Sequence, residues 1–117
     1  MILQVQKSFP AADLCLVEFI GKLQMGKESR EVERVLEELL GAGVKRVVFD
    51  LGKLDSIDST GVGLIVMGGG KMKKAGGELR VAGATGVVKD TLTMTHVDRL
   101  VRIFPSAEEA MQNFQVT

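Results

Sequence analysis

The stretch from Asp50 to Gly63 constrains the fold of this chain more than any other, because both of its flanking segments are expected to be buried. Residues 44–49, just before it, are rich in β-branched side chains, which is typical of a buried strand. The apolar run that begins at Val62 is best continued as a helix. The sequence therefore predicts a strand-to-helix crossing, in which the unpaired N–H groups of the helix N-terminus point at Ser59.

Polar residues fill this crossing and indicate what it can bind. The hydroxyl of Ser59 is expected to be exposed, and the nearby glycines let another backbone come close. Such a place suits a phosphoryl group or a partner protein. We interpret Asp58 as the N-cap of the helix and Asp55 as a turn residue. The two carboxylates could instead form a pair for acid–base chemistry or for a metal, but the sequence favours the N-cap interpretation.

The length and composition indicate one globular domain over residues 1–117. The 15 basic and 15 acidic residues give a net charge of zero, so the charge of the chain does not indicate nucleic acid or an acidic membrane as a partner. The chain has no Trp and no Tyr, so it also lacks the stacking surface of single-strand nucleic-acid binders. The single cysteine, Cys15, is expected to be a core residue. No apolar run approaches the roughly 18 residues of a membrane helix, so we expect a cytoplasmic location.

The periodicity of the apolar residues predicts five strands and four helices. Strands are predicted at residues 3–9, 14–20, 45–51, 78–82 and 101–104. Helices are predicted at residues 29–40, 60–74 and 86–93, and after Ser106, which opens a capping box. The order β-β-α-β-α-β-α-β-α predicts an α/β fold with a mixed, mostly parallel sheet of about five strands. The initial hairpin would form its antiparallel edge, and the four helices would lie mainly on one face.

The helical patterns also predict which side chains face inward. These are Val32, Val35, Leu36, Leu39 and Leu40 in the first helix, and Val87, Val88, Leu92 and Val97 in and after the third. Gly68, Gly69 and Gly70 lie inside the second helix, where each costs about 1 kcal/mol relative to alanine. They indicate either close packing against a neighbour or a loosened second half. A loosened helix predicts that Gly69→Ala stabilises the protein.

Catalytic arrangements find little support in the sequence. His96 is the only histidine and Cys15 the only thiol. The chain therefore lacks the several His and Cys side chains of a metal cluster, and it offers no more than one possible Cys–His pair. A triad of Ser59, His96 and Asp98 lacks the G-x-S-x-G turn of a nucleophile elbow. The glycines before Lys71 do not form a Walker A loop, because Ile65 stands where that loop requires glycine. We therefore expect a protein that is not an enzyme and that binds no cofactor and no metal.

The chain resembles the STAS-domain anti-sigma-factor antagonists at Phe49–Leu51 and Leu54–Gly63. That family carries a strand, a loop and then a D-S-S/T-G-hydrophobic-G signature at the start of a helix. The resemblance extends through Gly76–Leu79 and Phe104–Ala110, so it covers nearly the whole chain. It implies a single STAS domain.

The resemblance further implies a phosphorylation switch at Ser59. In that family, the first hydroxyl after the aspartate is phosphorylated by a serine kinase that is itself the anti-sigma factor. Phosphorylation breaks the pairing of antagonist and anti-sigma factor, and a serine phosphatase restores it. The implied partner-binding residues are Gln24, Asp58, Ser59, Thr60, Gly61 and Gly63. We expect a monomer or a weak dimer.

One position departs from the family pattern. Many members carry an acidic residue at the end of a G-x-L-D run in the loop after the second strand, whereas this chain ends the run with Gln24. That loop is expected to flank Ser59, so the substitution bears on which kinase is recognised. The family also includes STAS modules that are never phosphorylated. The alternative function is therefore a ligand-binding or scaffold module in which Ser59 only caps its helix.

Overall fold

The computed structural model describes residues 3–114, in which five strands form one mixed sheet. The strands are β1 (Gln4–Ala11), β2 (Leu14–Leu23), β3 (Arg46–Ile57), β4 (Glu78–Ala82) and β5 (Ile103–Phe104). They lie in chain order; β1 pairs antiparallel with β2, and every later pair is parallel. This arrangement confirms the predicted fold class.

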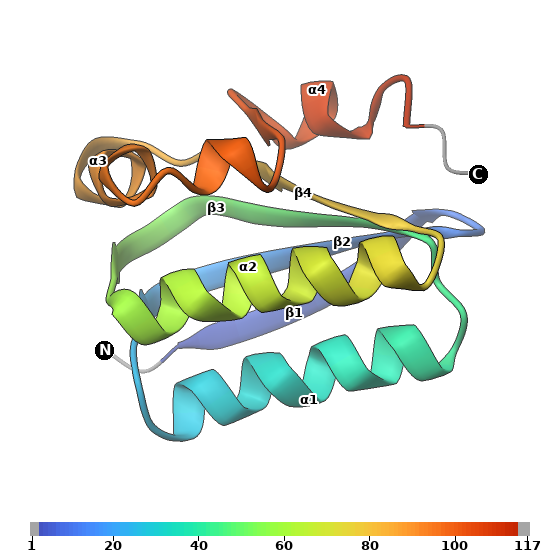
Figure 1. The fold of residues 1–117 in the computed structure, drawn as a ribbon, viewed down its shortest axis with the longest axis horizontal. Helices are drawn as coiled ribbons and strands as arrows, with labels where there is room; N and C mark the ends of the chain where they lie inside the picture. The colour runs from blue at the N-terminus through green and yellow to red at the C-terminus, as the bar shows by residue number, and fades with distance from the viewer. Residues whose placement is uncertain (1–2, 115–117) are drawn as a thin grey trace.

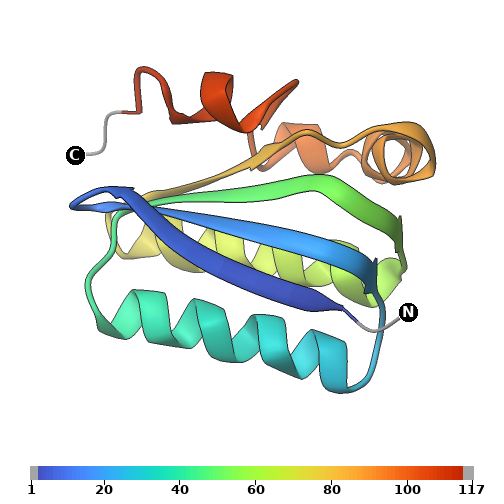
Figure 2. The same ribbon diagram turned by 180° about the vertical axis from the view of Figure 1, so that it is seen from behind.

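The helices cover both faces of the sheet, with the two longest on the same face. They are α1 (Lys27–Gly41), α2 (Ser59–Lys74), α3 (Gly86–Met94), the short 3₁₀ helix η1 (Val97–Arg99) and α4 (Ala107–Met111). Helices α1 and α2 lie side by side on one face, whereas α4 lies over the other (Figures 1 and 2). Helix α3 packs against β3. No helix within residues 3–114 is long and apolar enough to cross a bilayer.

The alternation of side chains along the strands divides the apolar interior into two cores. Val47 faces the larger core, which includes residues of α1, α2 and α3, whereas its neighbour Val48 faces a smaller core beneath α4. The rings of Phe19 and Phe49 belong to the larger core, with their centroids 4.8 Å apart. Cys15 is fully buried in the same core, as predicted. Three of the four helices thus contribute to one core.

A buried arginine holds α4 on the sheet. The guanidinium of Arg80 in β4 donates hydrogen bonds to the carbonyl oxygens of Ala110 and Gln112, both at 3.0 Å. It also lies 4.0 Å from the ring centroid of Phe114, which places a cation over an aromatic face. Because Arg80 is only 2% exposed, these contacts replace the water that its charge would otherwise need.

Strands β2 and β3 run further than the sequence predicts. Loops are predicted over residues 21–23 and 52–57, but both segments continue their strands in the structure. Leu23 pairs with Ile57, and both side chains are buried, so the pairing of the two strands outweighs the glycine and polar residues that suggested loops. The prediction that Asp55 is a turn residue is therefore wrong, because Asp55 lies within β3.

Helix α3 faces the core with fewer residues than predicted. Val88 and Leu92 are buried, as is Val97 in η1, but Val87 is 66% exposed. Successive helix positions are separated by about 100°, so Val88 and Leu92 share a face and Val87 falls outside it. Val87 instead lies on the exposed side with Met94, one heptad later.

The three glycines of α2 lie in an unbroken helix, and two of them are closely packed. A Cβ atom on Gly68 would lie 3.0 Å from Cδ1 of Leu36 in α1, and one on Gly69 would lie 2.8 Å from Cγ2 of Val101. A Cβ atom on Gly70 would meet nothing within 4 Å. Close packing is thus confirmed at two positions. A loosened second half is contradicted, and the predicted stabilisation by Gly69→Ala loses its basis, because it required that no neighbour occupy the space.

The contact between α1 and α2 yields a first stability prediction. Leu36 is 1% exposed, so Leu36→Ala should lower the free energy of unfolding by about 2–5 kcal/mol. The control is Glu33→Ala, on the exposed side of the same helix, which should change it by less than about 0.5 kcal/mol. Urea unfolding measures both, and similar losses in the two variants would contradict the packing described here.

The glycines of α2 yield a second prediction, with a matched pair of variants. Gly70→Ala should raise the free energy of unfolding by up to about 1 kcal/mol, because alanine is the better helix former and the space is open. Gly69→Ala gains the same helix propensity but must displace the buried Val101, so it should be less stable than Gly70→Ala. Thermal unfolding of both variants tests this order, and the reverse order would contradict it.

Candidate functional site

The candidate site is the N-terminus of α2, where Asp58 is the N-cap. Asp58 has an extended backbone, and its Oδ1 accepts a hydrogen bond of 2.9 Å from the N–H of Gly61. This confirms the predicted cap. Ser59 and Thr60 are the first two helical residues; Ser59 is exposed and Thr60 is half-buried. The hydroxyl of Ser59 is thus accessible at the positive end of a helix.

The second oxygen of Asp58 fixes the loop between β2 and α1 beside this helix start. Oδ2 accepts a hydrogen bond of 3.0 Å from the N–H of Met25, and the N–H of Asp58 donates to the carbonyl oxygen of Leu23 at 3.2 Å. Gln24 lies between these two anchored residues and is exposed. The structure therefore confirms that this loop flanks the start of α2.

The two glycines of the signature have different environments. Gly61 is buried, and a Cβ atom there would lie 2.6 Å from Cγ1 of Ile57 and 2.9 Å from Cγ of Leu23. Only glycine lets the first turn of α2 approach β2 this closely. Gly63 is exposed, with nothing within 4 Å of its Cβ position. Gly61 thus shapes the site from beneath, whereas Gly63 lies on its surface.

The structure adds Met25 to the residues that the sequence indicated. Its side chain is 76% exposed although its backbone is held by Asp58. An exposed methionine on an anchored loop can adapt its shape to a partner surface. The sequence offers one signal for it, an apolar residue in the loop segment Gln24–Gly26, and this signal alone does not separate an exposed contact from a core residue.

The carboxyl group of Asp58 is held in its ionised form. Burial by itself would raise the pKa of Asp58, but hydrogen bonds from the backbone N–H groups of Gly61, Met25 and Thr60 outweigh burial and lower the pKa below its ordinary value. At neutral pH, a fixed negative charge therefore lies next to the hydroxyl of Ser59. A second negative charge on Ser59 would be repelled by Asp58 and attracted by the helix N-terminus.

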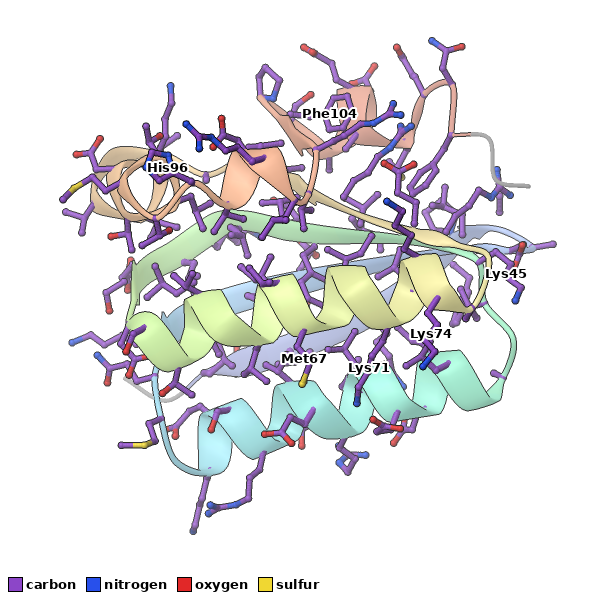
Figure 3. The ribbon with its side chains drawn as sticks, in the orientation of Figure 1. Lys45, Met67, Lys71, Lys74, His96 and Phe104 are labelled. Atoms are coloured by element: carbon purple, nitrogen blue, oxygen red, sulfur yellow. The ribbon has the colours of Figure 1, made fainter. Side chains whose placement is uncertain are left out.

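The only histidine lies apart from this site. His96 follows α3, with a left-handed backbone (φ 59°), and is labelled at the end of that helix in Figure 3. Helix α3, which His96 follows, packs against β3, whereas Ser59 is the first residue of α2. Within residues 3–114, no group of three His, Cys, Asp or Glu side chains is arranged to hold a metal ion.

Comparison with known proteins relates this arrangement to one family. The profile of the STAS domain matches residues 3–110. A curated putative anti-sigma factor antagonist of Thermotoga maritima is 31% identical over 78 residues, which cover 67% of this chain and 69% of that protein.

Solved structures share the fold. The crystal structure of a putative anti-sigma factor antagonist from Thermotoga maritima superposes with a TM-score of 0.82 at 23% identity, covering 96% of this chain and 93% of that one. The Bacillus cell fate determinant SpoIIAA in its phosphorylated form superposes with a TM-score of 0.75 at 13% identity, covering 96% and 100%. At these identities, the likeness shows the fold alone.

The two hydrogen bonds to Asp58 generate a third prediction. The pKa of Asp58 is lower in the folded protein than its ordinary value of 3.8, so its ionised form stabilises the fold above that pH. This stabilisation is lost as the pH falls through the folded pKa. Asp58→Ala, which loses the cap, should lower the free energy of unfolding at pH 7 by about 0.5–2 kcal/mol.

Asp58→Asn is the control for the charge, because asparagine is as good an N-cap but does not titrate. Between pH 5 and pH 2, the stability of this variant should fall less steeply than that of the unsubstituted protein. Urea unfolding across this range measures both slopes. Parallel slopes would show that Asp58 does not titrate with folding.

Proposed function

Since this chain belongs to the STAS domain family of anti-sigma factor antagonists, we propose that it binds an anti-sigma factor that is also a serine kinase. The observation that carries this proposal is the exposed hydroxyl of Ser59 as the first residue of α2, beside the N-cap Asp58. In its unphosphorylated form the protein binds the anti-sigma factor and so releases the sigma factor. Phosphorylation of Ser59 ends the pairing, and a serine phosphatase restores it.

The proposed docking surface surrounds Ser59. Its exposed members are Gln24, Met25, Ser59 and Gly63, with the half-buried Asp58 and Thr60 between them and the buried Gly61 beneath. Gly63 presents no side chain, so a partner backbone can approach the first turns of α2 closely. Met25 supplies the apolar contact, and Gln24 supplies a neutral donor and acceptor where many family members have a carboxylate.

The switch that we propose acts through charge at the interface. A phosphate adds about −1.5 to −2 charges at neutral pH, and a helix N-terminus typically stabilises an anion by about 0.3–1 kcal/mol. The fold is therefore expected to tolerate the modification. A partner that covers Ser59 would have to bury the phosphate next to the ionised Asp58, and burying such an uncompensated charge costs several kcal/mol.

The remaining parts of the proposal follow from this role. The protein acts as a binding partner and not as an enzyme, in the cytoplasm and without a cofactor. Residues 1–117 act as one STAS domain, as a monomer or a weak dimer.

The fourth prediction concerns Ser59 itself. Ser59→Ala should bind the cognate anti-sigma kinase but accept no phosphate from it, because the hydroxyl is absent. Ser59→Asp should bind at least about tenfold more weakly, which corresponds to 1.4 kcal/mol, and should melt close to the unsubstituted protein. Calorimetric titration measures the affinities, and intact mass after incubation with ATP and the kinase measures phosphate transfer.

Two control variants separate the switch from general effects of charge and of hydroxyl loss. Thr60→Ala removes the neighbouring hydroxyl and should still accept one phosphate. Ser8→Asp adds the same charge to the exposed strand β1 and should bind with unchanged affinity. Phosphate on Thr60 alone, or equal affinity with and without phosphate on Ser59, would end this proposal. A protein that binds but never accepts phosphate would instead be a fixed STAS module.

A further inference from the structure

The N-cap of α2 has one more hydrogen-bond acceptor than a helix cap uses. A cap needs a single side-chain oxygen, which serine or asparagine provides about as well as aspartate. At the start of α2, Oδ1 of Asp58 fills this role, because it accepts the N–H of Gly61 at 2.9 Å. Oδ2 is left for a second bond, which it accepts at 3.0 Å from the N–H of Met25 in the loop between β2 and α1. Among the residues that cap well, only aspartate has two oxygens that accept in this way.

This second bond is the one tie of the loop residues Gln24 and Met25. Leu23 before them ends β2, and Gly26 after them is the N-cap of α1, so both ends of the loop are fixed. Within residues 3–114, neither Gln24 nor Met25 forms another hydrogen bond. Each residue has two soft backbone dihedrals, so the bond to Asp58 supplies a constraint on their orientation that the fixed ends do not.

The orientation of these two residues matters because their side chains are exposed beside Ser59. Met25 is 76% exposed, and Gln24 is exposed as well. Helices α1 and α2 begin at the same end of the molecule, so the loop that leads into α1 lies next to the first residue of α2 (Figure 1). A partner that covers Ser59 would therefore meet this loop. A loop whose direction is already set loses less conformational freedom on binding.

Asp58 itself is poorly placed to contact a partner. The residue is half-buried, and both of its side-chain oxygens are directed at backbone N–H groups of this chain. If the carboxylate turned toward a partner, the N–H groups of Gly61 and Met25 would lose their acceptors. The effect of Asp58 on binding is therefore expected to pass through the loop.

We propose that Asp58 is a positioning residue for partner binding, and that it acts by holding Gln24 and Met25 in the orientation that the anti-sigma factor recognises. The inference rests on the function proposed above. It assigns to the loop the part of the docking surface that distinguishes one anti-sigma factor from another, since Gln24 stands where many family members have a carboxylate. A residue that only capped α2 could be an asparagine, whereas this role requires a second acceptor.

The first test uses the protein alone. Asp58→Asn and Asp58→Ser each keep one acceptor for the cap, but neither has a second oxygen for Met25. We expect NMR to show hydrogen exchange of the Met25 N–H about fivefold faster or more in both variants, while exchange of the Gly61 N–H stays unchanged. The control is Asp13→Asn at the opposite end of β2, where Oδ1 of Asp13 accepts the N–H of Lys45 at 3.1 Å; it should change neither amide. Unchanged exchange at Met25 in both Asp58 variants would overturn the proposal.

The second test measures binding to a purified anti-sigma serine kinase that phosphorylates the unsubstituted protein. In calorimetric titrations without ATP, Asp58→Asn should bind about threefold to tenfold more weakly, which is the range expected for one lost hydrogen bond. Met25→Ala should also bind more weakly, because it removes the contact that Asp58 positions. The two losses should not multiply in the double variant, because both changes act on the same contact. Asp13→Asn should bind with unchanged affinity.

The double variant separates positioning from a direct contact. If Asp58 touched the partner itself, its loss would multiply that of Met25→Ala, and multiplied losses would overturn the positioning role while leaving the proposed function intact. Unchanged affinity of Asp58→Asn would overturn the positioning role as well. If no anti-sigma kinase binds or phosphorylates the unsubstituted protein, the proposed function fails and this inference fails with it.

Discussion

The geometry of the candidate site depends on one carboxylate, which accepts hydrogen bonds both from its own helix and from a loop far away in the sequence. Asp58 binds the N–H of Gly61 in its own helix and that of Met25, which lies 33 residues earlier. The backbone of Leu23 binds Asp58 in turn. The start of α2 and the loop after β2 therefore form one unit, and Gly61 lets this unit lie directly against β2.

Local patterns in the sequence are enough to predict the order of the elements and the cap at Asp58. Helical periodicity and capping depend on residues within a few positions of one another, and these are visible in a single chain. The length of β3 is different, because residues 52–57 stay extended through pairing with β2. That pairing joins Leu23 to Ile57, and no local pattern around Asp55 reveals it.

Packing between residues that are far apart in the sequence explains why the predictions for Gly69 and Val87 failed. Nothing in the sequence of α2 shows that a side chain at position 69 would clash. The clash comes from Val101, which lies 32 residues later in the chain but next to Gly69 in the fold. Val87 is as apolar as Val88, and only the placement of α3 against β3 decides which one is buried. The candidate site was predictable where it rests on residue type, as for Ser59 and Gln24. Met25 depends on how its loop is anchored, so its exposure emerged only from the structure.

The anchoring of this site also affects how quickly it can respond to a partner. Within residues 3–114, Ser59 is exposed on a capped helix and its neighbouring loop is already held, so no described segment has to open or become ordered before a partner reaches it. Movements of that kind take microseconds to seconds in proteins that need them. In the switch that we propose, such a surface would follow the balance of kinase and phosphatase with no delay of its own, so the memory of a past signal would reside in those two enzymes.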